Sequence, residues 1–180
     1  MGFFKKDKDK DAPQPAAAAE TALVPLSNEA IINVLKAREY SYAVDNSGDV
    51  FGSWGEEGHR LWFLRSGQDK EILNVRYVHA TLFDAGLLHA LYEFCNAWND
   101  NKLFPKAYVR VKESGRISLI GELTIDLEHG VTPQQLDLFM RCGITTGLRM
   151  GESADEKFGG GAPVEKFGGA APDETPGVVH

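Results

Sequence analysis

The sequence predicts an α+β fold in which a mainly antiparallel sheet of about six strands packs against three helices, in the order α-β-β-β-β-α-β-β-α. Residues 117–127 alternate apolar and polar side chains, which is the two-residue period of a strand with one buried face. Residues 105–111 form a second strand pattern, and Gly115 marks a turn between the two. A strong helix start follows at Thr132. The chain of 180 residues is 43% apolar, which is enough for one packed core.

The two strands on either side of Gly115 are expected to form a hairpin with a defined register. The valines of the first strand must share a face with the apolar residues of the second if both are to reach the core. A three-residue loop, 113–115, meets this requirement, with Gly115 in the left-handed conformation of a type I turn and bulge. The predicted cross-strand pairs are Val111 with Ile117, Val109 with Leu119, Tyr108 with Ile120 and Lys106 with Glu122.

Two helices and four strands are expected before this hairpin. Ser27 is the predicted N-cap of a helix that turns an apolar stripe toward the sheet. From Tyr40 the period changes to two, and the N-S-G-D sequence at 46–49 is a turn. The second helix is expected to start at Asp84 and to end at the N-D-N sequence of residues 99–101. The strands between these helices are predicted at residues 40–44, 50–54, 61–65 and 72–78.

The third helix has the clearest start signal in the chain. Thr132 is its predicted N-cap, and Gln135 is placed to close a capping box. The helical pattern continues to about Met150. Gly143 and Gly147 thin this helix, so we expect them to allow close approach of another helix.

The composition divides the chain into a domain of residues 27–150 between two segments expected to be disordered, 1–26 and 151–180. The leader combines a charge run with alanine and proline, which cannot bury enough apolar surface to offset the entropy of ordering. The tail is acidic, is rich in glycine and proline, and repeats E-K-F-G-G. Phe158 and Phe167 would then be apolar anchors on a flexible segment, unless the tail is only a linker with a duplicated stretch.

Charge and cysteine usage limit the partners and the compartment. The net charge of −7 argues against binding of nucleic acid or of an anionic membrane, because both need a clustered positive field. No run approaches the roughly 20 apolar residues of a membrane span. Cys95 and Cys142 fall in apolar helical patterns without metal-type spacing, so both are expected to be reduced. These features predict a cytoplasmic protein.

No residue cluster in the sequence dictates a reaction. The five histidines show no HxH or HExxH pairing, and the glycine-rich phosphate and dinucleotide loops and the hydrolase elbow are missing. We therefore expect no catalytic residue, no cofactor, no metal site and no concave site with perturbed titratable groups. An enzyme whose site is assembled from dispersed residues is the less favoured alternative.

Four short motifs follow one another in a characteristic order after the first helix and four strands. They are N-A-W-N at 96–99, P-K-A-Y-V-R-V at 105–111, G-E-L-T-I-D-L at 121–127 and G-V-T-P-Q-Q-L at 130–136. In this order the chain resembles the YbjN-domain family over about residues 27–150. The resemblance implies a bacterial sensory transduction regulator, a fold similar to the class I chaperones of type III secretion, and no catalytic residues. The positions that match the motifs, and that look architectural, are Trp98, Asn99, Pro105, Arg110 and Gly130.

Together these observations predict a non-catalytic, chaperone-like or regulatory protein-binding domain in a bacterial cytoplasm. Its partner is expected to be another protein or a second copy of the chain. On the sheet face opposite the core, Tyr108 and Ile120 would be the anchors and Arg110 the polar clamp, since aromatic and arginine residues dominate such interfaces. Phe158 and Phe167 are the next candidates. A small-ligand sensor domain is the alternative function.

Overall fold

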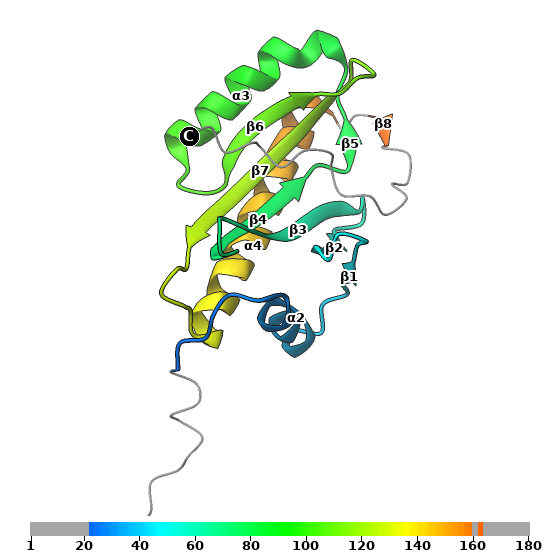
Figure 1. Ribbon diagram of the computed structural model, residues 1–180. Coiled ribbons are helices and arrows are strands. Elements are labelled where there is room, and N and C mark those ends of the chain that lie inside the picture. Colours follow the sequence, from blue (N-terminus) through cyan, green and yellow to red (C-terminus); the bar gives the residue numbers. More distant parts are fainter. Residues whose placement is uncertain (1–21, 160–161, 164–180) are drawn as a thin grey trace, which may run out of the picture.

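The structure, a computed structural model, describes residues 22–159 and 162–163. Within these residues it contains three α-helices and a six-stranded antiparallel sheet, as predicted (Figure 1). The sheet has the strand order β1-β2-β3-β4-β7-β6, and a separate pair joins β5 to β8. The elements are α2 (Asn28–Ala37), β1 (Ala43–Val44), β2 (Val50–Trp54), β3 (His59–Ser66), β4 (Ile72–Val78), β5 (Thr81–Leu82), the 3-10 turn η1 (Ala85–Leu87), α3 (Leu88–Asn101), β6 (Lys106–Val111), β7 (Ile117–Asp126), α4 (Pro133–Phe158) and β8 (Ala162–Pro163).

The three described α-helices cover one face of the sheet. Helix α4 lies along the central strands, α3 runs beside the edge strand β6, and α2 contacts β2 and α4 (Figure 1). Their apolar stripes and the facing side chains of the sheet form one core, which includes Leu35, Phe63, Leu91, Leu119 and Leu136. The opposite face of the sheet contributes no residue to this core cluster.

The β6–β7 hairpin has the predicted register. The observed pairs include Val111 with Ile117, Val109 with Leu119, Tyr108 with Ile120 and Lys106 with Glu122. The N–H of Lys112 donates to the carbonyl of Arg116 at 2.8 Å, and Gly115 has a φ of +76°, so the three-residue loop is confirmed. The expectation that β7 buries one face only is wrong, because all side chains of residues 117–123 are buried.

The helix starts agree with the sequence at α2 and α4 but differ at α3. The Ser27 hydroxyl accepts a hydrogen bond from the third N–H after it, and Thr132 takes part in both hydrogen bonds of its capping box. Asp84 makes no side-chain capping bond; its carboxylate lies 3.6 Å from the Arg116 guanidinium instead. A 3-10 turn therefore precedes α3, which begins at Leu88.

Helix α4 lies very close to strand β4 because glycines face the strand. A Cβ atom at Gly143 would lie 2.6 Å from Cβ of Val75, and one at Gly147 would lie 2.7 Å from Cβ of Tyr77. Both distances are well below the roughly 3.5–4.0 Å at which carbon atoms pack. The glycines thus allow a close approach, as expected, but the prediction that the neighbour is another helix is wrong.

Helix α4 continues past the predicted end at Met150 to Phe158. Met150 and Ala154 are fully buried, and Phe158 packs edge-on against Phe83 and Phe94. These contacts stabilise the helical turns of residues 151–158, which the composition of the sequence had predicted to be disordered. The predicted tail boundary is wrong for this reason, and Phe158 belongs to the packed domain.

The end of the predicted leader also takes part in the fold. Val24 forms an antiparallel bridge with Val131 through two backbone hydrogen bonds of 3.0 and 2.9 Å. Leu26 is buried and belongs to the core cluster. The domain therefore begins before residue 27, while residues 1–21 lie outside the described part of the chain.

Replacing Gly147 with alanine is expected to destabilise the fold. The methyl group would overlap the buried Tyr77, and overpacking of this kind costs about 1–3 kcal/mol, against about 1 kcal/mol that alanine gains in a helix. Gly86→Ala is the matched control, since a Cβ atom there meets nothing within 4 Å. Urea titrations of both variants measure the effect; equal midpoints would show that α4 can move away from β4 without cost.

Candidate functional site

The face of the six-stranded sheet that points away from the helices, here called the outer face, is the main candidate surface. Its side chains come from alternate positions of β2, β3, β4, β7 and β6. Trp62 and Ile120 are each 3% exposed, yet neither belongs to the core cluster on the helical side. The middle of the outer face is formed by Phe51, Trp62, Arg76, Tyr108, Ile120 and Glu122, with Arg60, Lys106 and Arg110 around them.

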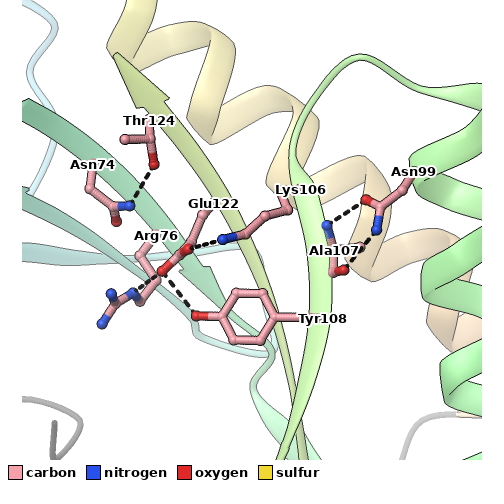
Figure 2. A network of polar contacts seen from close by, with 8 residues as sticks. All are labelled: Asn74, Arg76, Asn99, Lys106, Ala107, Tyr108, Glu122 and Thr124. Atoms are coloured by element: carbon pink, nitrogen blue, oxygen red, sulfur yellow. Dashed lines mark hydrogen bonds and ion pairs between the residues drawn. The ribbon is translucent and has the colours of Figure 1, made fainter. Parts of the chain in front are cut away.

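A buried ion pair crosses the middle of the outer face (Figure 2). Arg76 Nε donates to Glu122 Oε1 at 2.7 Å, and both side chains are 7% exposed. The Tyr108 hydroxyl donates to the same oxygen at 2.9 Å, and Lys106 Nζ lies 3.1 Å from Glu122 Oε2. The carboxylate thus receives three donors from two neighbouring strands, which compensates for the water that it loses.

This environment changes the pKa of two groups. Burial raises the pKa of Glu122, but the charge of Arg76 and the hydrogen bonds from Lys106 and Tyr108 lower it, and the net pKa lies below its ordinary value. Burial first, and then the charge of Glu122, raise the pKa of Tyr108 to about 12. At neutral pH the carboxylate is therefore charged and the phenol keeps the proton that it donates.

Aromatic rings and cations lie beside this network. Phe51 and Trp62 stack with their ring centroids 4.5 Å apart, and the Arg60 guanidinium lies 5.3 Å from the Phe51 centroid. Lys106 Nζ lies 5.2 Å from the centroid of the Tyr108 ring. The outer face is thus built from aromatic and arginine side chains, the types that are enriched in protein interfaces.

The structure brings three of the five predicted site residues together. Tyr108 and Ile120 are cross-strand neighbours, and Arg110 follows on the same face of β6. Ile120 is only 3% exposed, and its role as an anchor for a partner stays a prediction. Phe158 lies apart from them, against the aromatic residues of the helical side. Phe167 lies outside the described residues.

Sequence reasoning missed Trp62 and Arg76 as members of this face. The pairing of Arg76 with Glu122 requires β4 and β7 to be neighbours, and α3 and β6 separate these strands in the sequence. The available signal was the alternation in β4, where Asn74 and Arg76 interrupt the apolar residues at every second position.

Two residues of the recognised motifs, Trp98 and Asn99, connect the end of α3 to the start of the hairpin. The Asn99 side chain accepts from the N–H of Ala107 at 2.8 Å and donates to its carbonyl at 3.0 Å (Figure 2). Trp98 Nε1 donates to the carbonyl of Pro105 at 3.1 Å. The amide of Asn99 thereby replaces a neighbouring strand at this point of the edge strand β6.

A second cluster of titratable side chains is buried where β3 and β4 meet the end of α4. His59, His79 and Asp155 bring their nitrogen and oxygen atoms within 4.8 Å of one another. The Tyr77 hydroxyl lies 2.8 Å from His59 Nδ1. No cleft or pocket is described at this cluster, so the expectation that the chain has no concave site with perturbed titratable groups stays a prediction. Sequence spacing concealed the cluster, because Asp155 lies in the turns of α4 beyond the predicted helix end.

The hydrogen-bond pattern of this cluster does not suit a metal ion. His59 Nδ1 accepts from the N–H of Ala80 at 3.1 Å, so the neutral ring carries its proton on Nε2 and has no free lone pair. His79 Nε2 and Asp155 Oδ1 are 3.2 Å apart, without the alignment of a hydrogen bond. Without His59, the cluster offers only the imidazole of His79 and the carboxylate of Asp155. A protein zinc site has three or four protein ligands. The cluster instead connects α4 to the sheet.

The pKa of His59 predicts how stability depends on pH. Burial, and then the neighbouring His79, lower this pKa to about 4. An unfolded histidine has a pKa of about 6.5, so the unfolded chain takes up the proton first as the pH falls. Stability is expected to be complete above about pH 6.5 and to decrease by about 1–3 kcal/mol toward pH 4. His59→Asn keeps an acceptor for the Ala80 N–H, and its loss between pH 7 and pH 5 should be smaller in denaturant titrations. An equal loss would assign the acid sensitivity to other groups.

Glu122→Gln is expected to cost about 3 kcal/mol, because it leaves the charge of Arg76 buried without a counter-charge. Replacing both partners, by Arg76→Met with Glu122→Leu, should recover most of this loss. Glu113→Gln in the exposed hairpin loop is the control and should change stability by less than about 0.5 kcal/mol. Urea unfolding of all three variants measures these differences. A double variant as unstable as the single one would show that the ion pair is not the cause.

Comparisons with known proteins agree with this architecture. Among the described residues, no helix has both the length and the apolar character needed to cross a membrane. No curated protein matches the chain. One solved structure, described as "Crystal structure of YbjN, a putative transcription regulator from E. coli", has a TM-score of 0.58 and 15% identity, over 76% of this chain and 96% of that chain. This likeness shows the fold. A family model, "YbjN: Putative bacterial sensory transduction regulator", matches residues 27–156, so the chain belongs to the YbjN family.

Proposed function

We propose that this chain is a non-catalytic regulatory domain of a bacterial cytoplasm that binds a protein through its outer face. The observation that carries the proposal is the gathering of Phe51, Trp62, Tyr108 and Arg76 on a sheet face that no described helix covers. Tryptophan, tyrosine and arginine contribute most of the binding energy in many protein interfaces. The description of the family as a regulator supports the same function.

The geometry of the outer face suits recognition by a preformed surface. The ion pair of Arg76 and Glu122 joins β4 to β7, and Tyr108 joins β6 to the same carboxylate. A face held in this way loses little further freedom on binding, which lowers the entropic cost. Tyr108 and Arg110 are partly exposed and would contact the partner directly. Ile120 is buried, so it would contribute by supporting the Tyr108 side chain that lies beside it. The partner is another protein, including a client held in a chaperone-like manner, or a second copy of the chain.

A small-ligand sensor is the second candidate, favoured by the buried cluster around His59. Perturbed titratable groups gather at ligand sites more often than elsewhere. Catalysis is less favoured, because the Ala80 N–H and the Tyr77 hydroxyl both lie within hydrogen-bond distance of His59 Nδ1, which leaves this nitrogen unavailable as a general base. Thermal shifts with a metabolite collection, repeated on His59→Asn, would separate a sensor from a protein-binding domain.

Site-specific photocross-linking tests the protein-binding proposal. p-Benzoylphenylalanine replaces Tyr108 on the outer face in one variant and Tyr92 in the other, which is an exposed tyrosine on α3. After irradiation in the cells that make the protein, we expect an adduct of defined mass from position 108 and none from position 92. Mass spectrometry of the adduct identifies either a different protein or the chain itself.

Two results would contradict the proposal. Identical adducts from both positions would indicate non-specific contact, and an adduct from position 92 alone would move the binding surface to α3. Light scattering of both variants provides the control, since an unchanged mass shows that neither replacement alters the oligomeric state.

A further inference from the structure

We infer that the free edge of the sheet at β6 binds an extended segment of a partner protein, which joins the sheet as an additional strand. The binding groups are the backbone N–H and carbonyl groups of Val109 and Val111. This edge is distinct from the outer face, where side chains would make the contacts, so the inference does not depend on the proposed function.

Strand β6 is the last strand of the sheet and pairs on one side only, with β7. The backbone N–H of Lys112 donates to the carbonyl of Arg116 at 2.8 Å, so these two residues are a hydrogen-bonded pair. Hydrogen-bonded and non-hydrogen-bonded pairs alternate along an antiparallel ladder. The backbone groups of Ala107, Val109 and Val111 therefore point away from β7, toward the edge.

The side chain of Asn99 satisfies only the first of these three residues. It accepts from the N–H of Ala107 at 2.8 Å and donates to its carbonyl at 3.0 Å, as a neighbouring strand would. Within residues 22–159 and 162–163, the outward groups of Val109 and Val111 have no such partner. The edge is thus closed at one end and open over the rest of β6.

Helix α3 lies beside β6 without covering the far end of the strand (Figure 1). Leu91 and Cys95 of α3 are buried in the core, on the helical side of the sheet, and the helix reaches the edge itself through Asn99 in its last turn. At the other end of β6 the Val111 side chain is 52% exposed. A pairing edge and an apolar side chain are therefore accessible at the same place.

The arrangement of these groups identifies the occupant as an extended polypeptide. One N–H and one carbonyl recur at every second residue, about 6.6 Å apart, which is the repeat of a strand backbone. A helix bonds its own backbone groups internally and cannot satisfy them. Addition of a strand to an exposed edge is an established mode of peptide recognition. Beside Val111 the segment is expected to carry an apolar or β-branched side chain, because cross-strand neighbours of this type stabilise a pair.

A second copy of the chain fits this edge less well than a single extended segment. In a symmetric antiparallel pairing that places Val109 opposite Val111 of the second copy, Glu113 of that copy would lie opposite Ala107. Asn99 already occupies the pairing position there, so it would meet the hairpin loop of the second copy. A segment without such a loop can end before this point. The occupant is therefore a segment of a different protein.

The opposite edge of the sheet provides a matched control. Strand β1 has only two residues, and short edge strands limit pairing with other chains. Val44 nevertheless resembles Val111, because it is 49% exposed and its N–H also points outward. This direction follows from the next pair, in which the N–H of Asp45 donates to the carbonyl of Asp49.

Amide exchange with water, measured by NMR on the full-length protein, tests the inference. The probe is a synthetic peptide of about eight alternating threonine and valine residues, within the length of typical strands. N-methylation at every second residue leaves the probe one pairing edge, so it cannot build sheets with itself. The control peptide is N-methylated at every residue and has no donor.

In the free protein we expect the amide protons of Val109 and Val111 to exchange as exposed amides do. Exchange should slow by about tenfold once the probe occupies nine-tenths of the protein, because only the free edge then exchanges. Val44 should not change, and the control peptide should have no effect. Val111→Pro removes one outward donor without breaking a bond to β7, and should weaken binding of the probe by about fivefold or more. Val44→Pro should leave the binding unchanged.

Four results would overturn the inference, and the first three need no variant. Protection of Val109 and Val111 in the free protein would show that the edge is closed, by a second copy if light scattering gives a dimeric mass. Unchanged exchange with the probe would show that no strand is added. Equal protection of Val44, or equal protection by the control peptide, would show contact without pairing at this edge. Unaltered affinity of a folded Val111→Pro variant would exclude the Val111 N–H as a donor.

Discussion

The close contact between α4 and β4 determines the positions of the other layers. Gly143 and Gly147 let the helix backbone approach Val75 and Tyr77 directly, without an intervening layer of side chains. Tyr77 is then buried with its hydroxyl near His59, at the far end of the strand. The same approach carries the last turns of α4 along the sheet, where they meet α3. The core, the histidine cluster and the place of α3 all depend on this one spacing.

Because the helices share one face, the other face of the sheet must be stabilised in a different way. The ion pair of Arg76 and Glu122 is a poor source of stability, since burying both charges costs nearly as much as their attraction returns. It is effective at defining the pairing of β4, β7 and β6. A one-residue slip of β7 would turn Glu122 into the core and Leu123 away from it, which neither side chain tolerates. The pair therefore specifies the register of the central strands.

Local patterns in the sequence were sufficient for the elements whose interactions are local. The loop at Gly115 and the capping box at Thr132 depend on neighbouring residues, and both were predicted with their register and start. The end of α4 was not predictable in this way, because Ala154 is buried in the core and Phe158 packs against Phe83 and Phe94, which lie far away in the sequence. Only some of the contacts on the outer face could be predicted from the sequence, for the same reason. Its pairs within one hairpin follow from periodicity, whereas Arg76 reaches Glu122 through a strand pairing between distant parts of the sequence.

The two faces of the sheet also respond differently to the surroundings. On the helical side the contacts are mainly apolar, and the burial of apolar surface that stabilises them does not depend on charge. On the outer face the Arg76 and Glu122 pair is shielded from solvent and is insensitive to salt, while Lys106 is exposed and screened at physiological ionic strength. The inner pair thus keeps the pairing of the strands constant, while the contact of Lys106 with Glu122 weakens as the salt concentration rises.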